Sequence, residues 1–473
     1  MIREGLTYSD VLLVPKKTPL SSRKEAKTST YFTKNIKINS PLVSANMATV
    51  TEHKMAIALA REGGIGVIHQ FLSLDEQVEE VRKVKKSTSY VIENPTSVSK
   101  DITISEAVSI MDKEIVTSLL VKENDELIGI FTSRDYLFED NWDKKIFEVM
   151  TPKEKLITAP DNTTIDQAKH ILHEHRIEKL PLVKDGKVTG LMTTQDIKKI
   201  EFWPNASRDE KGRLLVAAAV GIKDSEERIQ ALIDVGVDVI VLDIAHAHSI
   251  HMIEKLKQLK SKFKIDIMVG NIATADAAKD LIEAGADGLK VGVGPGSICS
   301  TRLMSGAGVP QLTAVMDVAS VASQHNVPIC ADGGIQLPGD IPKALAAGSD
   351  TVMCGSLFAG CKESPGIIMT KDGRRYKRYI GSASYENSHN RAEKETGKKV
   401  KEKLDVFVEG VSNLVEYKGT VSDIISTLMN GLRSGISYCG ATDIPELKKN
   451  AEFIRITDAA RVESATRGKK IAD

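Results

Sequence analysis

At 473 residues the chain is long enough for more than one domain, and its 64 basic and 64 acidic residues cancel, which gives no indication of a nucleic-acid or membrane partner. No apolar run reaches the length of a membrane span, the first residues lack the apolar core of a signal peptide, and the five cysteines include no Cys-x-x-Cys pair. We therefore expect a cytoplasmic protein without a disulfide framework or a zinc site.

Strand-like and helical segments alternate along most of the chain. Two apolar strands, within 41–47 and 64–69, are followed by amphipathic helices over 52–62 and 74–86. After an interruption the alternation resumes with six more strands, expected near 214–221, 237–244, 266–271, 288–293, 327–331 and 350–355. Two plus six strands make eight, which predicts an α/β fold of the (β/α)8 TIM-barrel type. An open, doubly wound sheet is the alternative, and it does not require a count of eight.

The interruption contains an internal duplication. Seven positions recur 61 residues later: Ile104, Ala107, Ile110, Leu119, Gly129, Thr132 and Asp135 reappear as Ile165, Ala168, Ile171, Leu180, Gly190, Thr193 and Asp196. Each half is expected to form a helix, a strand, a hairpin strand and a second helix. The chain is therefore expected to consist of a first barrel part, 1–89, an inserted domain, 90–204, and a second barrel part, 205–473.

The duplicated pattern resembles a tandem pair of CBS modules, often called a Bateman domain. In that family a Thr/Ser and Asp motif binds the ribose of adenine or guanine nucleotides. The resemblance implies ATP or GTP as a regulatory ligand, at Thr132, Ser133, Asp135, Thr193, Thr194 and Asp196. A Thr-x-x-Asp motif before a helix is also an ordinary N-terminal cap, and both interpretations stay open.

A long charged segment, about 371–405, follows the eighth expected strand. One interpretation is a solvated surface excursion. On a barrel, however, the segment leaves from the strand end at which active sites lie, so we expect a mobile flap over the site.

A glycine-rich loop after the sixth strand delivers a cysteine. Residues 289–301 read Leu-Lys-Val-Gly-Val-Gly-Pro-Gly-Ser-Ile-Cys-Ser-Thr, an apolar strand that breaks into a loop and ends beyond Cys299. A free cysteine is often simply a small buried residue. The polar and cationic neighbours here, Ser297, Ser300, Thr301 and Arg302, favour a thiolate, so Cys299 is a candidate nucleophile.

Glycine-rich turns also follow the seventh and eighth strands. Ala331-Asp-Gly-Gly and Cys354-Gly-Ser stand where TIM barrels commonly hold phosphate, and Asp332 is suited to the hydroxyls of a ribose. The implied ligand is a nucleoside monophosphate whose base reaches Cys299. His246 and His248 follow the fourth strand, but two histidines without a third ligand nearby do not predict a metal site.

Over almost its whole length the chain resembles the IMP dehydrogenase and GMP reductase family, on Gly292-Val-Gly-Pro-Gly-Ser-Ile-Cys-Ser-Thr-Arg, Ala331-Asp-Gly-Gly-Ile and the nested CBS pair. The resemblance implies that Cys299 attacks C2 of the purine, that hydride passes between C2 and NAD, and that Thr301 helps to position water. Substrate-binding positions match Ser297, Asp332, Gly333, Gly334, Gly355, Ser356, Tyr379, Gly381 and Glu409. Positions at the dinucleotide match Asp243, Asn271, Gly292 and Gly294.

The resemblance also implies a K⁺ ion held by the carbonyls of Gly294, Gly296 and Cys299. In the family a neighbouring subunit completes this site with residues that match Glu463, Ser464 and Ala465. We therefore expect a homotetramer or an octamer.

Several motifs are close to the dehydrogenase branch of the family: Thr51-Glu52, Ile65-Gly-Val-Ile-His, Leu432-Arg-Ser-Gly-Ile-Ser-Tyr-Cys-Gly-Ala and Phe453-Ile-Arg-Ile-Thr. They predict oxidation of IMP to XMP in guanine nucleotide synthesis, with Arg391 matching the flap arginine that activates water. Two departures stand against this: Ala392 follows Arg391 where a tyrosine is usual, and Ala45-Asn46-Met47 is closer to the reductases. The alternatives are a GMP reductase, which deaminates GMP to IMP with NADPH, and a nucleotide-sensing protein without catalysis.

Overall fold

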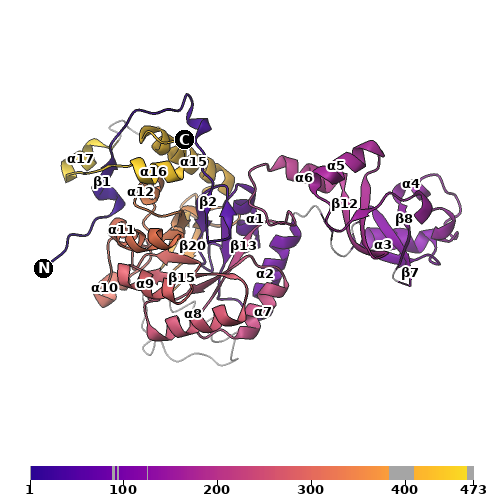
Figure 1. The fold of residues 1–473 in the computed structure, drawn as a ribbon, viewed down its shortest axis with the longest axis horizontal. Helices are drawn as coiled ribbons and strands as arrows, with labels where there is room; N and C mark the ends of the chain where they lie inside the picture. Colours follow the sequence, from indigo (N-terminus) through magenta and orange to yellow (C-terminus); the bar gives the residue numbers. More distant parts are fainter. Residues whose placement is uncertain are drawn as a thin grey trace. The chain divides into compact units, whose positions relative to one another are not determined.

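The computed structural model describes residues 2–87, 91–92, 95–114, 116–124, 126–382 and 410–465. The chain divides into two compact units (Figure 1). The first comprises Met1–Ser87, Asn205–Asp209 and Leu214–Asp473, and the second comprises Thr88–Pro204 and Glu210–Arg213. Arg391, Glu409 and most of the expected flap lie outside the described residues.

The first unit is built on a closed barrel in the order β13-β14-β15-β16-β17-β18-β4-β5, with every neighbouring pair parallel. Its strands are β4 (Leu42–Ser44), β5 (Ile65–Ile68), β13 (Val216–Val220), β14 (Val239–Asp243), β15 (Asp266–Ile272), β16 (Gly288–Val291), β17 (Ile329–Asp332) and β18 (Thr351–Cys354). The eight-stranded prediction is confirmed, and closure excludes the open doubly wound sheet.

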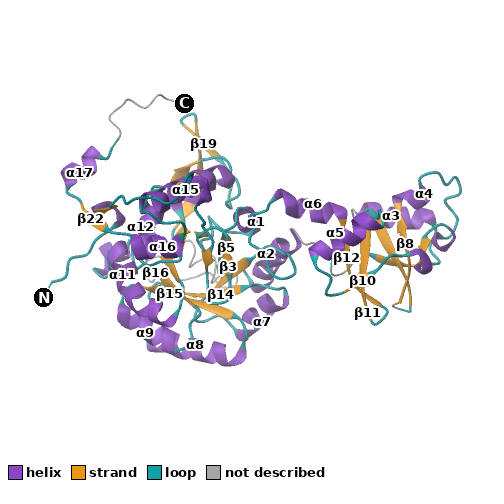
Figure 2. Cartoon of the chain, turned by 45° about the horizontal axis from the view of Figure 1, so that its top comes forward, coloured by secondary structure: helices purple, strands orange, loops and turns teal. Residues whose placement is uncertain are grey.

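Helices surround this barrel on its outer face (Figure 2). They are α1 (His53–Arg61), α2 (Leu74–Ser87), α7 (Glu226–Asp234), α8 (Ile250–Lys262), α9 (Ala275–Glu283), α11 (Gln311–Ala322) and α12 (Asp340–Ala346). Two short helices, α10 (Thr301–Ser305) and α13 (Ser356–Ala359), follow β16 and β18. Strands such as β13 and β14 are buried at every residue, because one face meets the barrel interior and the other meets helices. Ser225, Ser249 and Thr274 cap α7, α8 and α9 by accepting a hydrogen bond from a backbone N–H of the first turn.

Further elements of the first unit cover the barrel or extend from it: η1 (Tyr8–Asp10), β1 (Val11–Leu13), η2 (Arg23–Glu25), β2 (Thr30–Tyr31), β3 (Lys37–Ile38), η5 (Ser323–His325), β19 (Met369–Lys371), β20 (Arg374–Ile380), β21 (Ser412–Glu416), α15 (Val421–Tyr438), α16 (Ile444–Asn450), β22 (Phe453–Arg455) and α17 (Asp458–Glu463). Strands β19, β20 and β21 form one antiparallel sheet, and β20 brings Tyr379 to the barrel. Within the described residues, no helix is long and apolar enough to cross a membrane.

The second unit holds a sheet in the order β10-β11-β12-β8-β7-β6, with β9 paired to β8. Its elements are β6 (Ser97–Ser99), α3 (Ile104–Glu114), β7 (Ser118–Glu123), β8 (Glu126–Thr132), α4 (Ser133–Tyr136), η3 (Ile146–Glu148), β9 (Thr151–Pro152), η4 (Lys153–Lys155), β10 (Ala159–Pro160), α5 (Ile165–Glu174), β11 (Lys179–Lys184), β12 (Lys187–Thr193) and α6 (Thr194–Phe202). Both halves run helix, hairpin, helix, and each packs its own apolar cluster.

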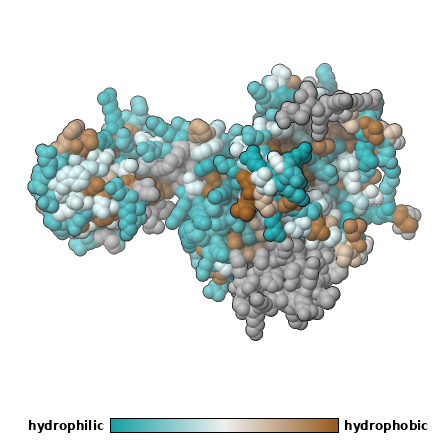
Figure 3. Space-filling model, turned by 180° about the vertical axis from the view of Figure 1, so that it is seen from behind, coloured by the Kyte–Doolittle hydropathy of each residue, from teal (hydrophilic) through white to brown (hydrophobic). Residues whose placement is uncertain are grey.

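The described surface on the face shown in Figure 3 is mostly hydrophilic, and its hydrophobic residues form small separate patches. This agrees with a chain in which 27% of residues are charged and nearly all barrel-strand residues are buried.

Candidate active site

A cavity of about 620 Å³ opens at the carboxyl end of the barrel strands, and residues in or just after all eight strands line it. This is the end at which TIM barrels carry their chemistry. Most of the residues selected from the sequence line this one cavity: Asp243, Asn271, Gly292, Gly294, Gly296, Ser297, Cys299, Thr301, Asp332, Gly333, Gly334, Gly355, Ser356, Tyr379 and Gly381.

Cys299 is the exposed member of the five cysteines, all of which the structure describes. Its Sγ lies 3.1 Å from Oγ1 of Thr301. The other four are buried, and burial raises the pKa of both Cys330 and Cys361 to about 12, so these thiols stay protonated at neutral pH. Of the five, Cys299 therefore has the surroundings of a nucleophile.

The loop that carries Cys299 needs glycine where it leaves β16. Gly292 has φ +151°, and a Cβ there would lie 2.1 Å from the carbonyl oxygen of Asp332. Arg302 braces the loop from inside, because its Nε donates to the carbonyl of Val293 (3.1 Å) and its Nη2 to the carbonyl of Val309 (2.5 Å). Arg302, which the sequence predicts as a cationic neighbour of Cys299, therefore also holds the backbone of the loop in place.

Lys290 was not among the predicted site residues, and it lies between two carboxylates of the site, those of Asp243 and Asp332. Its side chain is 3% exposed, and its Nζ lies 2.7 Å from Oδ1 of Asp243 and 2.8 Å from Oδ2 of Asp332. It also donates to Oδ1 of Asn271. Burial by itself lowers the pKa of Lys290, but the two carboxylates outweigh it and raise the pKa above its ordinary value. The sequence does contain an indication of this role, because a lysine between Leu289 and Val291 interrupts an otherwise apolar strand.

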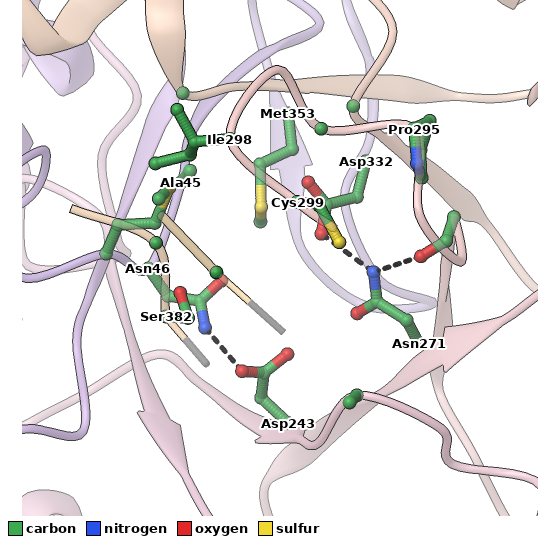
Figure 4. A pocket seen from close by; sticks show the side chains of 18 of the residues that line it. Ala45, Asn46, Asp243, Asn271, Pro295, Ile298, Cys299, Asp332, Met353 and Ser382 are labelled. Atoms are coloured by element: carbon green, nitrogen blue, oxygen red, sulfur yellow. Dashed lines mark hydrogen bonds between the residues drawn. The ribbon is translucent and has the colours of Figure 1, made fainter. Parts of the chain in front are cut away.

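Amide side chains orient both carboxylates (Figure 4). Nδ2 of Asn46 donates to Oδ2 of Asp243 at 2.7 Å. Nδ2 of Asn271 donates to the carbonyl of Gly292 at 2.6 Å and to Oδ2 of Asp332 at 3.0 Å. Asp243 and Asn271 were selected as contacts of a dinucleotide, and the structure places both in a network that reaches the carboxylate of Asp332.

The glycine turns after β17 and β18 face the same cavity. Gly333 and Gly334 have φ +94° and +83°, values that favour glycine, and they line the same cavity as Gly355 and Ser356. A Cβ on Gly355 would lie 2.6 Å from the hydroxyl of Tyr379, so this position must also stay small. Such backbone can hold an oxyanion close to the chain.

Tyr379 reaches this turn from β20. It is 4% exposed, and burial raises its pKa, against the smaller opposite effect of a hydrogen bond with Ser297. The hydroxyl therefore remains protonated and can donate a hydrogen bond to a ligand.

The two histidines after β14 are not part of a group of three candidate metal ligands among the described residues. Nε2 of His248 lies 2.9 Å from Oδ2 of Asp280 on α9, and neither His246 nor His248 lines the cavity. Among the described residues, no group of three or more His, Cys, Asp or Glu side chains is placed to hold a metal ion.

The expected K⁺ ligands lie in two places. Gly294, Gly296 and Cys299 share the loop, where the carbonyl of Gly296 accepts a hydrogen bond from the N–H of Cys299 at 3.1 Å. Glu463 ends α17, and Ser464 and Ala465 follow it. None of these three residues lines the cavity of its own chain.

In the second unit, the Thr-Ser-Arg-Asp motif forms a helix cap. The carboxylate of Asp135 accepts hydrogen bonds from the N–H (2.6 Å) and the hydroxyl (2.8 Å) of Thr132, which precede α4. Thr193 ends β12 and Thr194 begins α6, while the side chain of Asp196 lies outside what the structure describes. Thr132 and Asp135 therefore form the helix cap that was one of the two interpretations of this motif, and this cap does not decide whether the motif also binds a nucleotide.

Fold and site together define a TIM-barrel protein in which a cysteine loop, two glycine turns and a buried Lys-Asp network share one cavity. The chain belongs to the IMP dehydrogenase / GMP reductase family, whose domain model matches residues 5–467. The family resemblance seen in the sequence is thereby confirmed.

Relatives named inosine-5'-monophosphate dehydrogenase match nearly the full length. The protein from Nitrosopumilus maritimus is 51% identical over 98% of both chains, and that from Aquifex aeolicus is 50% identical over 98% of this chain and 95% of its own. Among solved structures, a cysteine-to-alanine variant of Trypanosoma brucei GMP reductase, in complex with guanosine 5'-monophosphate, is 41% identical over 99% of both chains, with a TM-score of 0.88.

Proposed function

We propose that this protein is a cytoplasmic enzyme that oxidises IMP to XMP with NAD, a step of guanine nucleotide synthesis. The observation that carries the proposal is the exposed Cys299 in the same cavity as the glycine turns at Gly333 and Gly355. The relatives from N. maritimus and A. aeolicus, which share about half of their residues with this chain, are named for this activity. Formation of XMP, identified by mass, from IMP and NAD tests the proposal, and recovery of unchanged IMP contradicts it.

The chemistry requires a nucleophile at C2 of the purine. The Cys299 thiolate forms a sulfur–carbon bond at C2, and the hydride that leaves C2 gives a thioimidate. Bound NAD supplies the acceptor for that hydride. Water then adds at C2 and the sulfur–carbon bond breaks, which releases XMP and restores the thiol. The Thr301 hydroxyl is proposed to orient this water, and its distance of 3.1 Å from the sulfur supports that role.

Binding and orientation of IMP are assigned to the cavity wall. Gly333, Gly334, Gly355 and Ser356 would receive the 5'-phosphate on backbone N–H groups and a hydroxyl. Asp332, held by Lys290 and Asn271, would accept hydrogen bonds from the ribose. Ser297, Tyr379, Gly381 and Glu409 complete the proposed substrate positions, with Glu409 outside the described residues.

The lining of the cavity supports the assignment of a dinucleotide beside the purine. A cavity of about 620 Å³ is in the ordinary range for small-molecule sites, and it continues from Cys299 to Asp243 and Phe71. Asp243, Asn271, Gly292 and Gly294 are the proposed contacts. Water activation is assigned to Arg391, a residue of the flap, although Ala392 follows it.

A K⁺ ion is proposed at the carbonyls of Gly294, Gly296 and Cys299, because backbone oxygens in a tight loop suit a hard cation with weak geometric demands. Glu463, Ser464 and Ala465 of a neighbouring subunit would complete the site, in a homotetramer or an octamer.

Replacing K⁺ by a larger organic cation at equal ionic strength is expected to remove most of the activity. The physical reason is that the loop would lose the cation that balances its inward-facing carbonyls. Steady-state rates in the two salts, with the oligomer size from light scattering, provide the measurement. Full activity without K⁺, or full activity of a monomer, would contradict the proposal.

The second unit is proposed to be a regulatory tandem CBS domain that binds ATP or GTP at Thr132, Ser133, Asp135, Thr193, Thr194 and Asp196. Its described residues contribute no strand to the closed barrel and do not line the cavity.

Replacing residues 90–204 by a short linker is therefore expected to leave kcat for IMP oxidation within about threefold of wild type, because the catalytic groups are all in the first unit. The response of the rate to added ATP or GTP should disappear. Initial rates with and without each nucleotide test this. A deletion protein with a native circular dichroism spectrum and no activity would show that the second unit is needed for catalysis.

GMP reduction is the second candidate function. It is favoured by the likeness to the T. brucei GMP reductase structure and by Asn46, in the Ala45-Asn46-Met47 run, which binds Asp243 at 2.7 Å. A nucleotide sensor without catalysis is less well supported, because the nucleophile and its cavity are both present.

A further inference from the structure

Lys377 is a buried lysine outside the catalytic network. It lies in the middle of β20 and is 2% exposed. Its Nζ donates to the carbonyls of Cys361 (2.9 Å) and Ser364 (2.5 Å) and to the hydroxyl of Ser364 (3.0 Å). These acceptors are neutral oxygens. Burial of an ammonium group is costly unless its hydrogen bonds are satisfied, so this arrangement binds the lysine firmly to the chain around it.

The carbonyls that Lys377 holds belong to the turn after α13. That short helix begins at Ser356, directly after Gly355, so the turn forms the rear of the segment assigned to the 5'-phosphate. The hydroxyl of Ser364 lies 2.7 Å from the carbonyl of Ala359 and 2.8 Å from that of Cys361. Lys377 and Ser364 together therefore satisfy the carbonyl end of this segment and fix its position.

Strand β20, which carries Lys377, also reaches the substrate cavity through Tyr379. Two residues beyond Lys377, Tyr379 places its hydroxyl beside Gly355. Backbone hydrogen bonds also tie the turn to the residues after β21, the strand that pairs with β20: the N–H of Lys362 donates to the carbonyl of Gly419 (2.7 Å), and the N–H of Lys418 donates to the carbonyl of Gly360 (2.9 Å). The ammonium group thus joins the rear of the glycine turn to the strand that carries Tyr379.

We infer that Lys377 is a positioning residue that sets the spacing between the Gly355-Ser356 turn and Tyr379, and that it thereby determines affinity for the 5'-phosphate of the substrate. This inference rests on the proposed function, which assigns the phosphate to that turn. Lys377 touches no ligand itself and acts through the turn and the strand.

The test compares Lys377→Met, which keeps the length of the side chain but removes its donors, with Lys371→Met at an exposed position of the same sheet. Three probes separate the parts of the ligand: IMP, ribose 5-phosphate, which lacks the base, and inosine, which lacks the phosphate. Dissociation constants are measured by calorimetry for the first two and by competition with IMP for inosine.

Lys377→Met is expected to weaken the binding of IMP and of ribose 5-phosphate by the same factor, about tenfold. Loss of a hydrogen bond from a charged group changes an affinity by roughly this factor or more. Inosine affinity and the affinities of Lys371→Met should equal those of wild type. Ser364→Ala keeps the lysine but removes one acceptor, so it should raise the dissociation constants of the same two ligands by a smaller factor. This variant provides the test if Lys377→Met does not fold.

Equal weakening of all three ligands, as general disruption of the cavity produces, would overturn the inference, and so would unchanged affinities in both Lys377→Met and Ser364→Ala. The phosphate comparison requires no turnover. A wild-type protein that binds ribose 5-phosphate but does not oxidise IMP would therefore contradict the proposed function while leaving this test decisive for Lys377.

Discussion

Replacing Cys299 by alanine is expected to lower the turnover of IMP by roughly 10⁴-fold or more, because the thiolate forms the bond on which both chemical steps depend. Binding of IMP should stay within a few-fold of wild type, since the proposed phosphate and ribose contacts come from Ser356, Asp332 and the glycine turns. Turnover measured from cofactor reduction, and the dissociation constant measured by calorimetry on the same preparation, separate the two effects.

Cys439→Ala is the matched control. Cys439 is buried at the end of α15 and does not line the cavity, so this variant should retain its activity. A Cys299→Ala enzyme with turnover close to wild type would rule out the covalent mechanism, and loss of IMP binding in that variant would assign the cysteine a structural role.

Lys290→Met is expected to produce the second large effect, on stability as well as on rate. Removing the cation leaves Asp243 and Asp332 close together in a largely buried site, and loss of one partner from a buried ion pair costs about 3–5 kcal/mol. The orientation of Asp332 toward the ribose should be lost too, which lowers kcat/KM by roughly a hundredfold or more. Urea unfolding gives the first quantity and initial rates give the second.

Lys262→Met breaks an ion pair of the same length, 2.7 Å to Glu226, but at a position where the two side chains are 49% and 34% exposed. It should cost less than about 1 kcal/mol. Unfolding is best followed by circular dichroism, because both tryptophans, Trp142 and Trp203, lie in the second unit while Lys290 and Lys262 lie in the first. If Lys290→Met is as stable and as active as Lys262→Met, the Lys-Asp network is not what holds the site.

The barrel could be predicted because its strands are covered on both faces. Most read as near-continuous apolar runs between helical segments, so the count of eight followed from the sequence. The limits were close: 214–221 was expected where β13 spans Val216–Val220. The glycine turns and Cys299 were also recognisable, since glycine at these positions reflects a local requirement, such as φ +151° and the crowded carbonyl at Gly292.

The side chains that orient the site could not be found in this way. Lys290 contacts Asp243 and Asp332 only because closure of the barrel brings β14, β16 and β17 together, and no sequence spacing indicates that convergence. Asn46 likewise contacts Asp243 from the loop after β4, 197 residues away in the chain. Lys377 resembles its solvated neighbours in a basic stretch, and only burial distinguishes it.

The direction of the reaction distinguishes IMP oxidation from GMP reduction. Purified protein in K⁺ buffer is given IMP with NAD in one cuvette and GMP with NADPH in another, and the absorbance of the reduced nicotinamide is followed in both. We expect the absorbance to rise in the first cuvette, with XMP as product, and to stay constant in the second. A fall in the second with release of ammonia, and no rise in the first, would contradict this expectation and establish GMP reduction instead.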